Sequence, residues 1–175
     1  MNIFSKGKEQ GLEDILTQRE WRANRIAELL AQYRQTVVCY KLNIPGSIKN
    51  NEWIKNIFAQ GKQAILEQLA LSSCIYKEEK ISDAGDELFL VVQSDAVEVK
   101  KIMCLIEENH YFGRLFDIDV LTENESVSRT QIGYAERKCL ICENKAVLCG
   151  RNRTHTVVEL QNKISEMYFV WTGIS

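Results

Sequence analysis

Residues 87–121 read ELFLVVQSDAVEVKKIMCLIEENHYFGRLFDIDVL, and their pattern predicts a strand, a helix and a second strand in succession. Its first part, residues 87–93, is apolar enough to predict a central strand. A helix N-cap at Asp95 begins a segment with helical spacing of apolar residues, which predicts a helix to about Asn109. Residues 114–121 predict a strand, since residues 116–120 alternate apolar and polar side chains as a half-buried strand does.

The preceding sequence predicts three more elements. Residues 36–43 (TVVCYKLN) are β-branched and aromatic, which favours a strand. Residues 51–70 carry apolar side chains at helical spacing, and residues 74–81 predict a further strand. The order in residues 36–121 is therefore β-α-β-β-α-β. This order indicates an α+β fold of the ferredoxin-like arrangement, in which two helices cover one face of a sheet.

Two segments flank this core in what we expect to be a single domain of 175 residues. Residues 9–34 form an N-terminal helical arm, in which Thr17 and Glu20 have the spacing of a capping box. Residues 122–175 form a C-terminal extension, of which residues 129–154 are basic and rich in cysteine. Its last part, residues 156–170, has the apolar spacing of a closing helix.

The composition excludes several classes of protein. With 45% hydrophobic residues, 26% charged residues and a net charge of −2, the chain is typical of a globular domain and is not a globally basic nucleic-acid binder. The longest strongly apolar run, Leu88–Val92, is far short of the ~20 residues that a membrane helix needs. The first residues, MNIFSKGKEQG, have no apolar region of a signal peptide. We therefore expect no membrane association, and a reducing, cytoplasmic compartment for the six cysteines.

Two carboxylates stand on the last predicted strand. Asp117 and Asp119 are one pleat apart, so both point to one face while Phe116 and Ile118 point to the other. Carboxylates about 7 Å apart repel unless a cation or a basic group lies between them. Mg²⁺ suits this position, because it binds carboxylates and bridges substrate phosphates during displacement at phosphorus. The alternative is a wet strand face on which the aspartates are merely solvated.

The residues before this strand favour a phosphate site. Gly113 lets the backbone approach a ligand, and Arg114 can hold phosphate oxygens with two hydrogen bonds. His110 precedes them and is one of only two histidines in the chain.

A cysteine cluster lies in the C-terminal extension. Cys139, Cys142, Cys149 and His155 have the spacing C-x2-C-x6-C-x5-H. Three thiolates and one imidazole at such spacing can close a tetrahedral zinc site. Two other interpretations stay open: buried thiols that pack against the last helix, and a redox pair at Cys139 and Cys142.

The same segment is basic. Residues 137–153 carry a net charge of +4, so the remaining chain carries −6. This asymmetry indicates an anionic partner or, alternatively, a solvated loop. Arg19 and Arg22 are neighbours on one helix face and can converge on an anion or cover surface, and Lys49 lies on a loop. The basic residues of the segment are Arg137, Lys138, Lys145, Arg151 and Arg153.

Two motifs, taken together and in order, resemble a known family. They are His110…Gly113-Arg-Leu-x-Asp-x-Asp-Val120 and Arg137-x-Cys-Leu-x-Cys…Cys-x-Arg…His155. With Arg19-x2-Arg22 and Asn43-x-Pro-Gly-x-x-Lys49, the chain resembles the apo-citrate lyase phosphoribosyl-dephospho-CoA transferase (CitX) family over nearly its whole length. Ser47 and Tyr111 stand where the family often has proline, which affects the rigidity of two loops.

The resemblance implies a nucleotidyltransferase. Such enzymes move the phosphoribosyl-dephospho-CoA group from 2′-(5″-triphosphoribosyl)-3′-dephospho-CoA to a serine of the citrate lyase acyl carrier protein, and pyrophosphate leaves. It implies that Asp117 and Asp119 bind Mg²⁺, that one of them or His110 takes the serine proton, and, as a fold alternative, a nucleotidyltransferase-like core. The residues expected to hold phosphate oxygens are Arg19, Arg22, Lys49, Arg114, Arg137, Arg151 and Arg153.

Two other functions remain open at this stage. One is a non-catalytic module with a zinc knuckle that holds RNA or a protein, for which Tyr40, Phe89 and Phe116 would have to form an exposed stacking face. The other is a related carrier-protein transferase with a different donor. The net charge and the expected burial of these aromatics favour the transferase, without a nucleic-acid partner.

Overall fold

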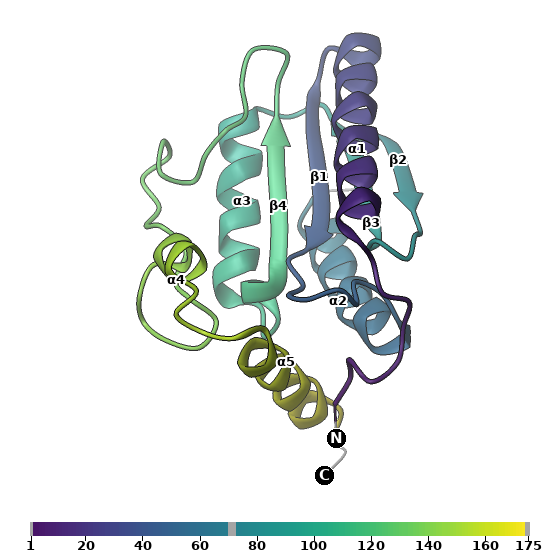
Figure 1. Ribbon diagram of the computed structural model, residues 1–175. Helices are drawn as coiled ribbons and strands as arrows, with labels where there is room; N and C mark the ends of the chain where they lie inside the picture. The colour runs from purple at the N-terminus through teal and green to yellow at the C-terminus, as the bar shows by residue number, and fades with distance from the viewer. Residues whose placement is uncertain (1, 70–72, 174–175) are drawn as a thin grey trace.

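The computed structural model describes residues 2–69 and 73–173 (Figure 1). These residues form one four-stranded antiparallel sheet and five α-helices, so the predicted α+β class is confirmed. Of the helices in these two ranges, none has both the length and the apolar character required to cross a membrane. In chain order the elements are α1 (Leu12–Tyr33), β1 (Thr36–Leu42), α2 (Glu52–Gln68), β2 (Cys74–Lys80), β3 (Glu87–Val92), α3 (Ala96–Asn109), the 3-10 turn η1 (Gly113–Leu115), β4 (Phe116–Leu121), α4 (Ala146–Asn152) and α5 (Val157–Thr172).

The strands lie in the order β2-β3-β1-β4, and each neighbouring pair is antiparallel. The alternation of strands and helices predicted for residues 36–121 is therefore present. β1 lies between β3 and β4, and its register with β4 places Lys41 opposite Asp117 and Cys39 opposite Asp119. This register fixes what the two aspartates meet.

One face of the sheet carries the main hydrophobic core. Helices α2 and α3 cover it, and the side chains of Tyr40, Phe116, Ile118 and Val120 are almost completely buried there. Tyr40 stacks on Phe58 of α2 at 4.8 Å between ring centroids. Because Tyr40, Phe89 and Phe116 are all fully buried, they cannot form the exposed stacking face that an RNA-binding module needs.

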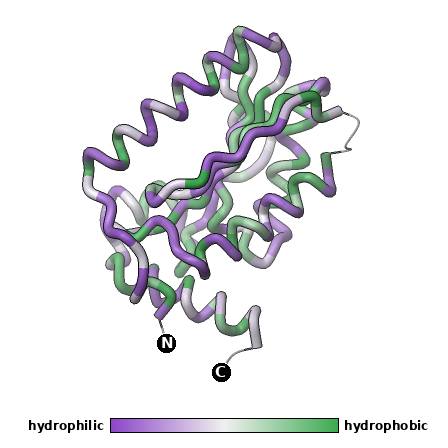
Figure 2. Tube along the Cα trace, turned by 90° about the vertical axis from the view of Figure 1, so that its right-hand side faces the viewer, coloured by the Kyte–Doolittle hydropathy of each residue, from purple (hydrophilic) through white to green (hydrophobic). Residues whose placement is uncertain are grey.

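Helix α1 covers the opposite face, so the sheet has helices on both sides (Figure 2). A smaller apolar cluster joins them: Leu29 of α1 packs with Val37 and Cys39 of β1 and with Phe89 and Val91 of β3. The prediction of two helices on one face holds for α2 and α3. Helix α1 forms a third layer, and its polar residues Gln18, Arg19 and Arg22 line a pocket beside the sheet.

The free edge of β4 is closed by two charged side chains of α3. Buried Lys100 donates from Nζ to the Ile118 carbonyl oxygen at 2.7 Å. Glu107, also buried, accepts from the Ile118 N–H at 3.2 Å. An edge strand otherwise exposes such groups to other chains, so these contacts fix the strand that carries Asp117 and Asp119.

Two local predictions were wrong. Thr17 does not start a helix, because α1 begins six residues earlier at N-cap Gly11, where Asp14 accepts from the Gly11 N–H. Arg114 and Leu115 do not begin the last strand. They belong to the η1 turn, and β4 starts at Phe116.

The predicted closing helix is confirmed as α5, whose first turn is capped by Thr156 and Glu159. It joins both ends of the chain to the core. Ser165 accepts from the Ile3 N–H at 3.2 Å, and the Tyr168 hydroxyl accepts from Asn56 of α2 at 2.8 Å.

Candidate active site

The two carboxylates of β4 point to the α1 side of the sheet, as their spacing predicts, and they share a cation. That cation is Lys41 of β1, whose Nζ lies 2.7 Å from Asp117 Oδ2 and 3.0 Å from Asp119 Oδ2. Arg137 lies farther away, with Nη1 3.9 Å from Asp117 Oδ1. The repulsion between the aspartates is therefore relieved by the protein's own basic groups.

Electrostatics keep this group charged. Burial lowers the pKa of Lys41, but Asp117 and Asp119 outweigh burial and raise that pKa overall. Burial raises the pKa of Asp117, and Lys41 with Arg137 reverses the effect and lowers it. Because two cations already balance two carboxylates, a divalent ion fits here only together with further anionic ligands, such as the oxygens of a polyphosphate.

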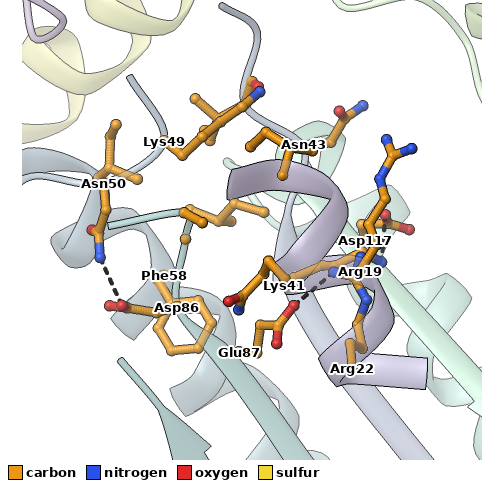
Figure 3. Close-up of a pocket in the computed structure, with 17 residues that line it drawn as sticks. Arg19, Arg22, Lys41, Asn43, Lys49, Asn50, Phe58, Asp86, Glu87 and Asp117 are labelled. Atoms are coloured by element: carbon orange, nitrogen blue, oxygen red, sulfur yellow. Dashed lines mark hydrogen bonds and ion pairs between the residues drawn. The ribbon is translucent and has the colours of Figure 1, made fainter. Parts of the chain in front are cut away.

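A pocket of about 150 Å³ opens beside this group, under α1 (Figure 3). Sites for drug-sized ligands usually have about 300–1,000 Å³, so this pocket can hold only part of a large substrate. It brings together residues predicted from three separate segments, Arg19 and Arg22 of α1, Lys49 of the loop after β1, and Asp117 of β4. Its other polar and charged lining residues are Gln18, Lys41, Asn43, Asn50, Asp86 and Glu87.

Two cations of the pocket, Arg19 and Lys49, form no ion pair within residues 2–69 and 73–173. Lys49 donates from Nζ to the Ile44 carbonyl oxygen. Burial lowers the pKa of Lys49, and repulsion from Arg19 lowers it further. Two like charges that face one pocket without a carboxylate partner favour binding of an anion.

Arg22, in contrast to Arg19 and Lys49, forms an ion pair in the part of the chain that the structure describes. Its Nη1 donates to Glu87 Oε1 at 2.6 Å, and the Glu87 side chain is only 2% exposed. Burial raises the pKa of Glu87, and Arg22 partly offsets this. Arg22 therefore first compensates a buried carboxylate, and only its remaining N–H groups are free to meet a ligand.

Three buried atoms that belong to pocket residues have no hydrogen-bond partner in the described part of the chain. They are Gln18 Nε2, Asn50 Oδ1 and Glu87 Oε2. Asn50 uses its Nδ2 atom to donate to Asp86 Oδ1 at 2.7 Å. Buried polar atoms are nearly always paired with protein or water, so these atoms suit a pocket that receives polar ligand groups.

Lys41 and Glu87 are site residues that the sequence analysis missed. Both stand at the ends of strands that are otherwise apolar, and a charged residue at such a position is a recognisable exception. The observed register of β1 with β4 places Lys41 beside the aspartates, but a single sequence does not define strand registers, so this contact was not predicted.

Arg114 and Arg137 connect β4 to the C-terminal extension. The Arg114 guanidinium donates to the Cys139 carbonyl oxygen. Arg137 donates to the carbonyl oxygens of Phe116 and, at 3.2 Å, Arg114. Both arginines thus bind backbone, and Arg137 also approaches Asp117.

His110 lies apart from the carboxylates. It ends α3, its ring packs on Phe116 at 4.8 Å between centroids, and its Nδ1 accepts from the Phe112 N–H at 3.0 Å. Burial lowers its pKa. Because Phe116 points into the core under α2 and α3, the structure brings His110 to the face opposite Asp117 and Asp119, and His110 does not line the pocket.

Arg151 and Arg153 lie on and after the short helix α4, and both are exposed. Other charges of this basic segment are paired: Lys138 with Glu143, and Lys145 with Glu136. Glu143 is already included in the net charge of residues 137–153, so only the pair with Glu136 makes the local positive excess smaller than that count.

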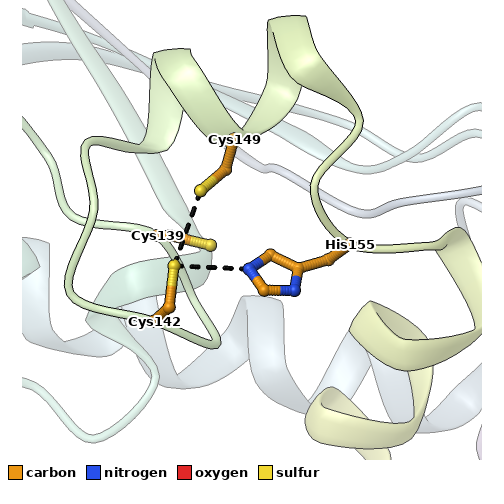
Figure 4. Close-up of side chains that lie close together, drawn as sticks. All are labelled: Cys139, Cys142, Cys149 and His155. Atoms are coloured by element: carbon orange, nitrogen blue, oxygen red, sulfur yellow. Dashed lines mark hydrogen bonds between the residues drawn. The ribbon is translucent and has the colours of Figure 1, made fainter.

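The predicted cysteine cluster does assemble (Figure 4). The ligand atoms of Cys139, Cys142, Cys149 and His155 all lie within 4.8 Å of one another. The three cysteines are free thiols. They lie beyond the Arg114 contact, outside the pocket under α1.

Comparison with known proteins identifies the class of enzyme. The family model for apo-citrate lyase phosphoribosyl-dephospho-CoA transferase matches residues 10–170. A protein named "Probable apo-citrate lyase phosphoribosyl-dephospho-CoA transferase" from Streptococcus pyogenes serotype M3 is 34% identical over 171 residues, which cover 95% of this chain and 89% of that protein. A protein of the same name from Vibrio cholerae serotype O1 is 34% identical over 163 residues, covering 89% and 90%.

A much longer relative matches over the same share of this chain. "Protein CitXG" from Leuconostoc mesenteroides subsp. cremoris is 34% identical over 175 residues, which cover 95% of this chain but only 37% of that protein. The chain is therefore a transferase, and it belongs to the apo-citrate lyase phosphoribosyl-dephospho-CoA transferase family.

Proposed function

We propose that this protein transfers the phosphoribosyl-dephospho-CoA group from 2′-(5″-triphosphoribosyl)-3′-dephospho-CoA to a serine of the citrate lyase acyl carrier protein and releases pyrophosphate. The names of its relatives support the transferred group and the apo-citrate lyase acceptor. A donor derived from CoA and six free thiols suit the cytoplasm. The strand order β2-β3-β1-β4 supports a ferredoxin-like core for the enzyme.

The observation that carries this proposal is a pair of cations beside a carboxylate, neither of which forms an ion pair within the described residues. Arg19 and Lys49 face the same pocket as Asp117. A triphosphate needs cations at its departing end. Beside the phosphorus that is attacked, it needs a carboxylate that accepts the proton of the nucleophile or holds a metal ion. We place the pyrophosphate end of the donor against Arg19 and Lys49, and the rest of the donor outside this small pocket.

The reaction is a displacement at phosphorus. The serine oxygen forms a bond to the innermost phosphorus of the triphosphate, the bond from that phosphorus to the pyrophosphate oxygen breaks, and the serine proton passes to a carboxylate. Asp117 or Asp119 is the proposed acceptor, because both lie at the pocket side of the sheet and His110 lies on the other. Lys41 orients both carboxylates for this step.

Mg²⁺ is the proposed metal ion. When bound, it neutralises charge on the polyphosphate and on the departing pyrophosphate. Asp117 and Asp119 would hold it together with triphosphate oxygens, since the two carboxylates alone are already balanced by Lys41 and Arg137. This arrangement makes Mg²⁺ affinity depend on the donor.

The acceptor is proposed to dock on α4. Val147 and Leu148 are 56% and 48% exposed, and Arg151 and Arg153 follow them on the same surface segment. An acidic carrier would be attracted to this surface, and the attraction would weaken with salt.

The test is intact-mass analysis of the purified apo carrier after incubation with enzyme, Mg²⁺ and the triphosphoribosyl donor. We expect one mass gain per carrier, equal to the phosphoribosyl-dephospho-CoA group, with one pyrophosphate released. A carrier with alanine in place of the modified serine is the control and should gain nothing. An unchanged mass with this donor, and a gain with another nucleotide donor, would support the related transferase instead.

A further inference from the structure

We infer that Cys139, Cys142, Cys149 and His155 bind one Zn²⁺ ion, and that this ion fixes Arg137 and Arg114 against the strand of the proposed active site. The site is outside the pocket and uses none of its residues. Zinc content can therefore be measured whatever donor or acceptor the enzyme uses.

The geometry fits a single tetrahedral ion. Cys142 Sγ lies 3.5 Å from Cys149 Sγ and 3.3 Å from His155 Nε2 (Figure 4). Ligand distances of ~2.3 Å for sulfur and ~2.0 Å for nitrogen put neighbouring ligand atoms about 3.5–3.8 Å apart around a tetrahedral zinc. The Cys142–Cys149 separation is far beyond the ~2.05 Å of a disulfide, which disfavours that pair as an oxidised bridge.

The donor types select the metal. Three sulfur atoms and one imidazole nitrogen are ligands for zinc, whereas Mg²⁺ and Ca²⁺ require oxygen. Four protein ligands leave no open position, so the ion is structural rather than catalytic.

The burial pattern is an independent second observation. Between residues 128 and 163 the only buried residues are Cys139 and Cys149. The apolar side chains of Ile141, Val147 and Leu148 are exposed by 39–56%. Ile132 and Leu140 are only partly buried, against the main core, and the two buried side chains of the segment are both sulfur ligands. A segment with so few buried apolar side chains needs a crosslink such as a metal ion. Ordinary buried thiols would instead be surrounded by apolar side chains.

The ion would act on the active site through two short connections. Cys139 is the first ligand, and its carbonyl oxygen accepts from the Arg114 guanidinium. Arg137, two residues earlier, donates to the carbonyl oxygens of Arg114 and Phe116 and approaches Asp117. Its own carbonyl oxygen accepts from the Ala146 N–H at 2.8 Å, which closes the loop around the ligands. Arg137 is therefore a positioning residue held by the zinc loop.

The first experiment measures metal in the full-length protein. Protein purified in the presence of zinc and then dialysed without chelator should contain about one Zn²⁺ per chain, and Co²⁺ substitution should give the intense visible bands of a tetrahedral sulfur site. Cys142→Ser and Cys149→Ser should each lose most of the metal. Cys74→Ser, which changes a free thiol on β2 outside the cluster, is the matched control and should keep it.

The second experiment tests positioning by hydrogen exchange, with no activity assay. Removal of zinc with a chelator should speed exchange in residues 129–155 and in residues 113–117, should leave β3 unchanged, and should be reversed by added zinc. Wild-type protein without zinc after reconstitution, full zinc in Cys142→Ser, or a disulfide between Cys139 and Cys142 in the purified protein would overturn the metal site. Faster exchange confined to residues 129–155 would overturn the connection to Asp117.

Discussion

The two faces of the sheet use the same four strands for different purposes. Toward α2 and α3, Phe116, Ile118 and Val120 of β4 enter the main core. Toward α1, the alternate residues Asp117 and Asp119 meet Lys41 and a polar pocket. Strand alternation thus separates the residues that stabilise the fold from those proposed to react, at a spacing of one residue.

The contrast between the two faces explains why the α1 face tolerates charged side chains. On the core face an unpaired carboxylate would carry a large desolvation penalty. On the α1 face, the Asp117 and Asp119 side chains remain 35% and 45% exposed and share Lys41. The two faces should therefore respond in opposite ways to substitution.

The largest expected effect is on the rate of transfer. Asp117→Asn and Asp119→Asn should each lower the transfer rate by about 10³-fold or more, because each removes a carboxylate from the reacting centre. Stability should change by less than about 1 kcal/mol, as is usual for partly exposed ion pairs. The gain in carrier mass over time measures the initial rate, and chemical denaturation measures the stability. A near wild-type rate in either variant would contradict the proposed role.

Phe116→Ala, which changes the residue next to Asp117, should show the reverse pattern, a large loss of stability with little loss of rate. Its ring packs against Tyr40 at 5.5 Å and against His110. Removing a buried phenylalanine side chain typically lowers the free energy of unfolding by about 3–5 kcal/mol. The rate per folded molecule should stay within a few-fold of wild type. Denaturant unfolding with active-site titration separates the two effects, and a stable but inactive variant would show that the faces are not independent.

Arg19→Met should weaken pyrophosphate binding by about 10- to 100-fold, which corresponds to the loss of a charge-assisted hydrogen bond of about 1.5–3 kcal/mol. Arg34→Met, which changes an exposed arginine paired weakly with Glu123 at the end of α1, is the matched control. Titration calorimetry measures both, and equal effects of the two substitutions would point to general charge instead of a site.

Lys49 gives the same site a pH dependence. Its pKa is lowered in the free protein by burial and by Arg19, and a bound anion should raise it. Pyrophosphate affinity should therefore be greatest where Lys49 is protonated, and should fall as pH rises through this lowered pKa. Calorimetry between about pH 7 and 10 measures the slope. In Lys49→Arg, which stays protonated, the lysine contribution to the slope should disappear; an unchanged slope would exclude Lys49.

The smallest effect is expected at His110. Because it lies on the core face, His110→Ala should lower the transfer rate by less than about tenfold, whereas loss of a general base costs about 10²–10⁴-fold. Steady-state rates at saturating donor decide between these values. A loss in the larger range would return His110 to the proton-transfer step.

The sequence predicts which side chains of the last strand share a face and which cysteine ligands converge, but it does not predict the site roles of two charged residues. Alternation in residues 116–121 predicts which side chains share a face, because that depends only on local strand geometry. The spacing of Cys139, Cys142, Cys149 and His155 likewise predicts their convergence, since the ligands are close in sequence. Lys41 and Glu87 were missed because their roles depend on strand register and on α1 crossing the sheet.

The binding position of pyrophosphate decides whether the pocket under α1 is the active site. A crystal structure of the zinc-loaded enzyme with Mg²⁺ and pyrophosphate should show the anion between Arg19 and Lys49, next to Asp117 on the α1 face of the sheet. Pyrophosphate bound on the opposite side, near His110, or bound only at Arg151 and Arg153 on α4, would contradict the account.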